Sequence, residues 1–268
     1  MICPNCGKLI SISEERCPFC GAWRPGMFGY GPALQRVVGN LEFPRLVTVA
    51  CIVLYVAALA LQPDAILGGG LGSLLSPGDR ALYQLGMTGG PAWRNGWYWT
   101  VLTAIYLHGS LLHIFFNLYS LRNIGTPVLR AFGGARGFVL FTLSGAVGYL
   151  VSNVASGHPT VGASGSIYGL LAALIVYGRR RGIPEMTNQL WMWAVLMFAL
   201  GFMPGSHVNN WAHAGGFGSG WLIAQRLPFS DERREGRGVQ VLALVLVVAT
   251  LAGFVLSFVK VTSLLMQG

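Results

Sequence analysis

Seven apolar runs, separated by mostly short polar connectors, dominate the hydrophobic pattern of the chain. The first run is bounded by Pro44 and Pro63, residues that suit the start and the end of a helix. Runs of this kind are typical of membrane-spanning helices. The pattern therefore predicts an all-α polytopic membrane protein with seven spans, at about 44–62, 108–129, 137–155, 164–178, 189–203, 211–227 and 239–259.

The connector after the first run is much longer than the others and holds an aromatic cluster, Trp93, Trp97, Tyr98 and Trp99. Tryptophan and tyrosine concentrate at membrane–water interfaces. We therefore expect a partly interfacial element here and not a solvated loop.

Composition agrees with a membrane protein. Of the 268 residues, 53% are hydrophobic and only 10% are charged, against roughly 25% charged residues in soluble domains. All nine acidic residues lie outside the apolar runs. The net charge of +9 would suit a protein that binds nucleic acid. The arginines, however, gather in the short connectors between spans, as membrane orientation requires. We expect the lipid bilayer, and no nucleic acid, as a partner.

The basic residues also predict the orientation. With the N-terminus in the cytoplasm, 15 of the 18 basic residues fall on that side, all except Arg80, Arg94 and Lys260, as the positive-inside rule requires. Seven spans then place the C-terminus outside. Because the N-terminus opens on a cysteine motif, we expect no cleavable signal peptide. The expected location is the cell membrane, or the inner membrane in a bacterium.

The first 22 residues carry two matching cysteine motifs. Cys3 and Cys6 form CPNC, Cys17 and Cys20 form CPFC, and a glycine follows each pair. Four thiolates in two C-x2-C pairs suit tetrahedral zinc, with a disulfide pair or a degenerate ribbon as the alternatives. So short a segment could hardly fold without metal, and we predict a structural zinc site. Cys51 lies in an apolar run and is expected to face lipid or the core.

The predicted second, fourth and sixth spans enter the membrane from the same side. Their first turns, which should meet near the outer third of the bilayer, hold the unusual polar residues of the membrane region. Such residues are costly within spans and are candidates for function. Taken alone, a serine there is usually a cap and a histidine a hydrogen-bonding residue between helices, but their joint placement favours a site. They are His108, His113, Asn117, Ser164, Asn210 and His213.

Ser164 begins an unusually short span. The 15 residues from Ser164 to Gly178 give a helix of ~22 Å, against a hydrocarbon core of ~30 Å. With the basic end of this span at the cytoplasmic interface, Ser164 lies below the outer surface. The irregular segment before it is tolerated only where protein covers it or where it faces a water-filled cavity. A hydrolase within the membrane needs a buried serine that water can reach.

Small residues in the fourth and sixth spans permit close helix contact. Such contact would bring His213 within hydrogen-bonding reach of Ser164, and a histidine base activates a serine nucleophile. Ordinary tight packing is the alternative. The small residues are Gly165, Gly169, Ala212, Gly216 and Gly220.

No aspartate or glutamate lies in a predicted span. This excludes an aspartyl pair, argues against a Ser-His-Asp triad and leaves a Ser-His dyad; the H-E-x-x-H motif of a zinc hydrolase is also missing from the sequence. His113 and Asn117 lie four residues apart, on one helical face. They suit stabilisation of an oxyanion, together with the Ser164 amide at its helix N-terminus.

Together these motifs resemble those of the rhomboid intramembrane serine proteases. The resemblance covers about residues 44–227, and the set is highly specific, although GxSG alone would be weak. It rests on H-x4-H-x3-N (His108, His113 and Asn117), GASG around Ser164 with Tyr168 four residues later, and AHAGG around His213 with Gly216 and Gly220.

The resemblance implies that Ser164 attacks the scissile carbonyl, and that His213 acts first as a base and then as an acid. It implies that His113 and Asn117 line the oxyanion site and that Tyr168 packs against His213. Family substrates are single-pass membrane proteins, cut near the outer end of a transmembrane helix that is easy to unwind. No cofactor for catalysis is implied.

His108 would support the structure near the first external loop. Gly162 and Gly165 are expected to leave room for a carbonyl and for a neighbouring helix. One departure is visible: where the family often has Trp-Arg in the first external loop, this chain has Trp99-Thr100. The hydrogen bonding of that loop is therefore open, but no catalytic position is affected.

The predicted division of the chain follows from these motifs. The zinc-ribbon-like module is an accessory outside the core, and the sequence does not identify a partner for it. The divisions are 1–22 (zinc-ribbon-like module), 23–43 (linker), 44–227 (rhomboid-like six-span catalytic core), 228–238 (basic cytoplasmic loop) and 239–268 (seventh transmembrane helix and tail).

Two other classes of function compete with a protease. A rhomboid-like protein that binds or escorts membrane proteins without cleaving them usually lacks the serine or the histidine, and both are present here. A transporter is disfavoured because intramembrane carboxylates and inverted repeats with broken helices are missing. A dyad also lacks the third residue that orients the imidazole, worth about 10⁴ in turnover in soluble triads, so we expect slow catalysis.

Overall fold

The computed structural model describes residues 1–3, 5–26, 30, 42–63, 75–203 and 208–267, so most of the predicted linker at 23–43 lies outside the described residues. A long helix coincides with each of the seven predicted spans. Within the described residues, pairing between extended segments is limited to isolated bridges, which confirms the all-α class. The long helices are α2 (Phe43–Leu61), α6 (Leu111–Phe132), α7 (Gly134–Ala155), α8 (Ser164–Arg181), α9 (Pro184–Leu200), α10 (Asn210–Arg226) and α11 (Arg237–Gln267).

Three of these helices, α2, α7 and α11, are each long and apolar enough to cross a membrane by length and composition. A fourth candidate span is α6 joined to the short helices before it, with a bend of 91° between the two parts. α9 and α10 have only 17 residues each, and α8 ends in three arginines. Several spans are therefore supported, while the count of seven stays a prediction.

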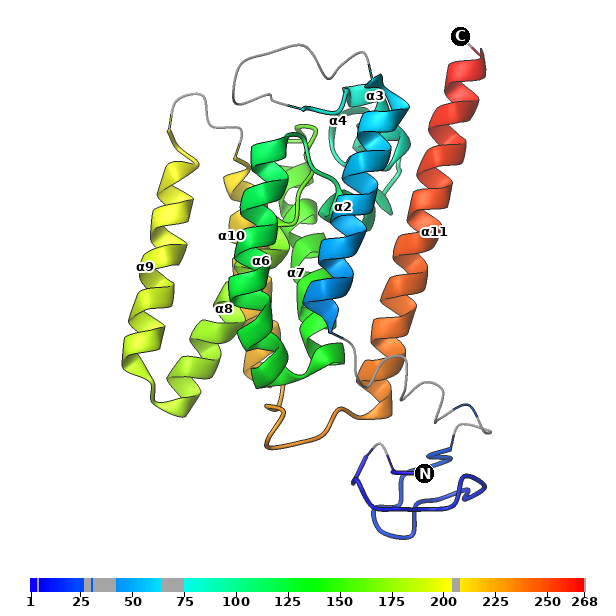
Figure 1. The fold of residues 1–268 in the computed structure, drawn as a ribbon, viewed down its shortest axis with the longest axis vertical. Coiled ribbons are helices and arrows are strands. Elements are labelled where there is room, and N and C mark those ends of the chain that lie inside the picture. The colour runs from blue at the N-terminus through cyan, green and yellow to red at the C-terminus, as the bar shows by residue number, and fades with distance from the viewer. Residues whose placement is uncertain (4, 27–29, 31–41, 64–74, 204–207, 268) are drawn as a thin grey trace.

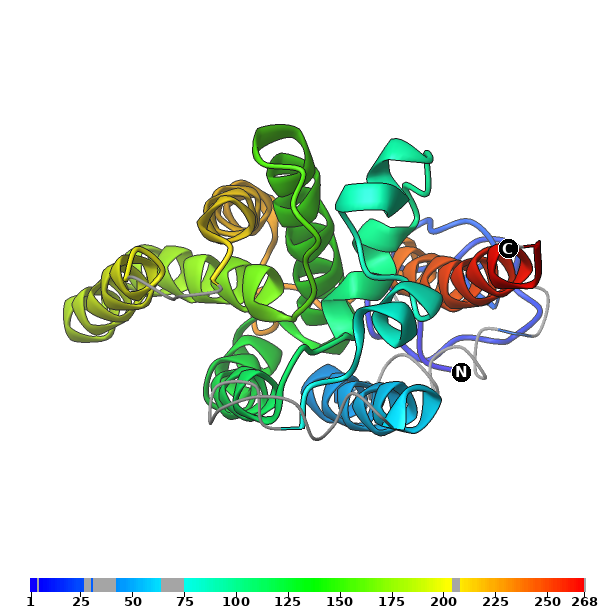
Figure 2. The same ribbon diagram turned by 90° about the horizontal axis from the view of Figure 1, so that it is seen from above.

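α7 and α8 form the centre of the bundle. Almost every residue of α8 from Gly165 to Val176 is buried, and α10 packs against both α7 and α8. α9 contacts α8 at one edge of the bundle, and α11 contacts α7 at the opposite edge (Figure 2). α9 exposes most of its apolar side chains, as a lipid-facing helix does.

The N-terminal module lies at the end of the bundle where α6, α8 and α10 end and α2, α7 and α11 begin (Figure 1). The last turns of α6, α8 and α10 carry Arg130, Arg179–Arg181 and Arg226. α11 ends at the opposite end of the bundle. The arginines thus gather at the module's end of the bundle, as the charge pattern predicts, and which side of a membrane that end faces stays a prediction.

The described part of the aromatic connector between α2 and α6, residues 75–110, is structured. It contains α3 (Asp79–Gln84), α4 (Gly90–Arg94), α5 (Thr100–Thr103) and the 3₁₀ turn η4 (Ala104–Tyr106). The side chains of Ile105 and Leu107 are fully buried. This segment is part of the packed core and not a solvated loop.

α6 begins at Leu111 and not at the expected position 108. Ser110 is its N-cap, and the Ser110 hydroxyl accepts the His113 N–H at 3.2 Å. A serine at this position fixes the start of the helix, because its hydroxyl accepts a backbone N–H that has no partner within the helix. His108 therefore lies before the helix, in the bend after η4.

Glycines allow α8 and α10 to touch through their backbones. A Cβ at Gly216 would overlap the carbonyl oxygen of Gly165, and one at Gly220 would overlap the backbone of Gly169. Ala212 O would lie 3.2 Å from a Cβ at Gly165. This close approach brings the first turns of the two helices together.

Candidate active site

Ser164 and His213 meet at the N-terminal ends of α8 and α10. His213 Nε2 lies 2.8 Å from Ser164 Oγ, although 49 residues separate the two along the chain. The His213 side chain is buried. A neutral imidazole that accepts from a serine hydroxyl at this distance is placed to remove its proton.

Tyr168 holds the imidazole of His213 from one face. The two rings stack with centroids 4.2 Å apart and an angle of 16° between their planes. Within the described residues, Nδ1 of His213 is buried and has no hydrogen-bonding partner in the protein. Packing therefore orients this imidazole where a soluble triad uses a carboxylate.

His113 approaches the serine segment from α6. Its Nδ1 accepts the Gly109 N–H at 3.4 Å, so in the neutral tautomer that this bond favours the proton is on Nε2. A Cβ at Gly162 would lie 2.6 Å from that Nε2, and Gly162 adopts a φ of +126° that disfavours other residues. Glycine two residues before Ser164 thus lets an N–H donor approach the backbone there.

Asn117 lies one turn after His113 and is turned toward its own helix. Its Nδ2 donates to His113 O at 2.9 Å, which uses one of the two amide hydrogens. His108 is fully buried and packs edge-on against His113, with ring centroids 5.1 Å apart. The buried ring of His108 thus packs against the ring of His113 and restricts its position.

The irregular segment before Ser164 is anchored to its neighbours and is buried only at its end, at Gly162 and Ala163, whereas His158 and Pro159 are exposed. Gly162 N–H donates to Ala104 O at 2.9 Å, and the Tyr149 hydroxyl donates to Gly162 O at 2.6 Å. Thr160 pairs with Thr88 through both of its backbone groups. Tyr149 was not among the sequence candidates, because a tyrosine in an apolar run has no pattern that marks it.

Asn209 caps α10 and ties it to its neighbours. Its Oδ1 accepts the Ala212 N–H at 3.1 Å, while its Nδ2 donates to Ser152 Oγ at 2.6 Å and to Thr160 Oγ1 at 2.9 Å. The sequence signal was the adjacent pair of asparagines before an apolar run. The second of them, Asn210, packs instead toward Gly201 at the end of α9.

A network of short polar side chains forms where the resemblance predicts an arginine. Thr100 Oγ1 lies 3.0 Å from Thr88 Oγ1 and 2.6 Å from Trp97 O. Asn153 Nδ2 donates to Thr88 Oγ1 at 3.0 Å. At the position where the family often has an arginine, Thr100 thus takes part in hydrogen bonds that link the connector to α7.

Residues 95–228, half of the chain, match the family of the rhomboid domain. The chain belongs to the rhomboid family. The matched range includes Ser164, His213, His113 and Asn117. Membership supports an integral, multi-pass membrane protein.

Curated relatives include proteases and an inactive member. The chain is similar to "Rhomboid protease GluP" of Bacillus subtilis, at 31% identity over 60% of this chain and 32% of the relative. It is similar to "Rhomboid-like protease 3" of Toxoplasma gondii, at 28% identity over 65% of each chain. "Inactive RHOMBOID-like protein 8" of Arabidopsis thaliana is 28% identical over 60% of this chain and 48% of the relative.

The match covers a limited part of these relatives. It spans about a third to a half of the length of GluP and of two plant relatives. Because an inactive protein is among the relatives, membership alone does not assign an activity. The arrangement of the site has to support it.

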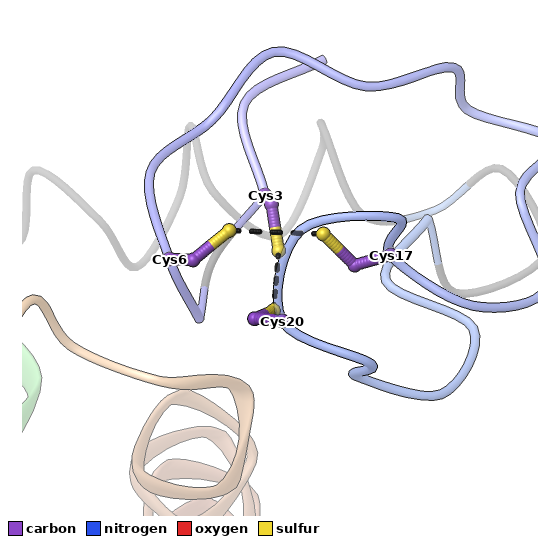
Figure 3. A group of neighbouring side chains, drawn as sticks. All are labelled: Cys3, Cys6, Cys17 and Cys20. Carbon is purple, nitrogen blue, oxygen red and sulfur yellow. Dashed lines mark hydrogen bonds between the residues drawn. The ribbon is translucent and has the colours of Figure 1, made fainter.

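The four N-terminal cysteines form a compact cluster. All four sulfurs lie within 4.8 Å of one another, with Cys3 and Cys20 at 3.8 Å and Cys6 and Cys17 at 3.7 Å (Figure 3). Every cysteine of the chain is free, so a disulfide pair is not formed. Tetrahedral ligands at ~2.3 Å from zinc lie about 3.8 Å apart, so the donor set fits a metal ion. Cys51 is buried in the core between helices.

Each cysteine pair closes a tight turn. Gly7 N–H donates to Cys3 O and Gly21 N–H donates to Cys17 O, both at 2.9 Å, and both glycines have a φ above +70°. Asn5 Nδ2 donates to Cys20 Sγ at 3.4 Å. This hydrogen bond, together with one from the Ala22 backbone, lowers the pKa of Cys20, which favours the thiolate that a metal requires.

Proposed function

We propose that the chain is an intramembrane serine endopeptidase of the rhomboid type, with Ser164 as nucleophile and His213 as general base. The observation that carries the proposal is the 2.8 Å contact between Ser164 Oγ and His213 Nε2, in which His213 is buried and Ser164 is partly exposed. A non-catalytic binding protein has no need of this pair in a reactive arrangement. Relatives named as proteases add support.

In the proposed reaction, His213 Nε2 takes the hydroxyl proton of Ser164 as Oγ attacks the carbonyl carbon of the substrate. The resulting oxyanion accepts hydrogen bonds from the Ser164 amide, His113 Nε2–H and the second hydrogen of Asn117 Nδ2. His213 then donates its proton to the leaving amine, and the acyl-enzyme forms. Water, activated by the same histidine, hydrolyses the ester and frees Ser164.

The proposed substrates are single-pass membrane proteins cleaved near the outer end of a transmembrane helix. Ser164 lies at the first position of α8, at the bundle end away from the arginines. A peptide bond reaches it only after the substrate helix unwinds locally, since helical carbonyls are held by their own hydrogen bonds. We also propose that the four-cysteine cluster holds one structural zinc ion, and that the N-terminus is cytoplasmic.

The test compares purified wild type with Ser164→Ala and Ser166→Ala in liposomes. Ser166 is a matched control because it is a buried serine on the same helix, two residues further on. Ser164→Ala should abolish both cleavage of a model transmembrane substrate and labelling by a fluorophosphonate probe. Ser166→Ala should retain both.

The two outcomes separate the candidate functions. Cleavage by Ser164→Ala at the wild-type rate would end the proposal. Wild type that is well folded yet neither cleaves nor takes the label would favour the binding or escort protein.

A further inference from the structure

α11 packs its polar residue Ser257 against the connector that precedes the active site. Ser257 is fully buried, and its Oγ accepts the Trp99 indole N–H at 3.0 Å while donating to Gly253 O at 2.9 Å. The hydroxyl thus donates within its own helix and accepts from the connector. The two residues lie 158 positions apart.

Side chains of α11 and the connector pack closely around the Trp99–Ser257 hydrogen bond. A Cβ at Gly253 would lie 3.0 Å from Thr103 Cγ2, and a Cβ at Gly86 would lie 2.7 Å from Ser257 Oγ. Phe254 packs edge-on against Tyr106 with centroids 6.3 Å apart. One face of α11 therefore contacts α5, η4 and the turn after α3 together.

The same connector touches the serine segment on its other side. Ala104, five residues after Trp99, accepts the Gly162 N–H at 2.9 Å. Thr103 Oγ1 donates to Gly86 O at 2.7 Å, and Thr88, two residues later, pairs with Thr160. The connector thus lies between α11 and the backbone that leads into Ser164.

We propose that Ser257 and Trp99 are positioning residues, through which α11 fixes the connector and so the backbone at Gly162. Neither side chain contacts the reacting atoms. They act by holding Ala104 O where it accepts the Gly162 N–H, two residues before the nucleophile. The inference rests on the proposed protease function where catalysis is the readout, but its structural part is measurable without any activity.

The test uses full-length Ser257→Ala and Trp99→Phe in liposomes. Each should lower kcat and the rate of fluorophosphonate labelling about five-fold, as loss of one buried hydrogen bond predicts. KM should stay unchanged, because no residue that contacts substrate is altered. The double variant should lose no more than either single one, since both substitutions break the same bond.

Thr250→Val is the matched control. Thr250 is a buried residue two turns earlier on α11, and its hydroxyl donates to Leu246 O within the same helix. Removing it should change neither rate. A Ser257→Ala protein that melts at a lower temperature but labels at the wild-type rate would have only a stabilising role, and would overturn the proposal.

Hydrogen exchange separates this inference from the protease proposal. Amide exchange in a peptide covering 157–163 should be about five-fold faster in Ser257→Ala and Trp99→Phe than in Thr250→Val. Faster exchange in a protein without protease activity would defeat only the proposed function. Unchanged exchange and unchanged labelling would defeat the positioning role.

Discussion

The α8–α10 pair and the four-cysteine module (residues 1–26) both hold distant segments together at a few atoms, but by different chemistry. In the helix pair, backbones touch at glycines and a large buried core surrounds them. In the module, the buried hydrophobic cluster consists of Cys3, Ile10 and Cys17, while Leu9 and Phe19 are 78% and 61% exposed. So small a core cannot offset the entropy of ordering the segment. Packing therefore fixes the candidate site, whereas we expect the module to need a metal ion.

Residues 233–237 form a joint between the module and α7, which packs against the helix pair. Arg237 Nη1 donates to Trp23 O at 2.8 Å and also to Arg24 O, and Arg233 Nη2 lies 3.5 Å from Asn5 Oδ1. On the other side, Arg136 Nη2 donates to the carbonyl oxygens of Arg233 and Arg234, each at 2.8 Å. The loop thus contacts the module through arginine side chains, and α7 through its backbone carbonyls and the Glu235 carboxylate.

The largest expected effect comes from separating the helix pair. Gly216→Ala places a Cβ against Gly165 O and should abolish cleavage, because overpacking costs ~1–3 kcal/mol and moves His213 from Ser164. Gly218→Ala is the matched control, since nothing lies within 4 Å of a Cβ there. Cleavage and thermal unfolding in detergent are the measurements. Equal behaviour of the two variants would show that close backbone contact does not fix the site.

Removing the metal should affect the module and spare the site. Wild type should contain one zinc ion per chain by metal analysis and Cys17→Ser none, while Cys51→Ala, outside the cluster, keeps it. The module of Cys17→Ser should become sensitive to proteolysis, since ligand binding and folding are coupled. Labelling of Ser164 should change less than about two-fold, because distant sites act almost independently.

A zinc-free but intact wild type would contradict the metal proposal. Loss of Ser164 labelling in Cys17→Ser would instead contradict the separation of the two regions. α8 has 18 residues, or ~27 Å of helix, between Ser164 and the module's end of the bundle. This distance is the reason that we expect loss of the metal to leave the labelling of Ser164 almost unchanged.

Periodic and repeated features were predictable from the sequence. The long helices follow from the apolar runs, and the cysteine cluster follows from two matching C-x2-C motifs. Ser164, His213 and His113 could be selected because polar residues are costly in apolar runs. The all-α class and the rhomboid family are confirmed, while the roles of these residues stay proposals.

Single long-range contacts were not predictable. Tyr149, Asn209 and the Trp99–Ser257 pair each depend on one side chain meeting a partner between 13 and 158 positions away. Such a contact leaves no period and no motif; only the capping role of Asn209 had a signal, the adjacent pair of asparagines. The start of α6 was misplaced by three residues because Ser110, a polar residue in a mixed stretch, is its cap.

The smallest expected effect lies at the joint between the module and α7. Glu235 Oε1 accepts the Arg136 N–H at 2.7 Å in the first turn of α7, and a Cβ at Gly133 would lie 2.7 Å from the same oxygen. Glu235→Ala removes this acceptor from a helix N-terminus and should cost ~1 kcal/mol of unfolding free energy. Glu235→Gln keeps an acceptor oxygen and should cost less.

The pH dependence of this pair of variants sharpens the test. Burial raises the pKa of Glu235 in the folded protein above its usual value, although backbone N–H groups of α7 act in the opposite direction. The folded state therefore binds this proton more tightly than the unfolded state does. The contribution of Glu235 to stability is then fully present below the unfolded pKa of about 4.3 and is lost as pH rises through the folded value. The melting temperature of wild type should thus rise relative to that of Glu235→Gln as pH falls from about 7 to 4. Parallel plots of melting temperature against pH for the two proteins would show that the carboxylate at the joint is not buried.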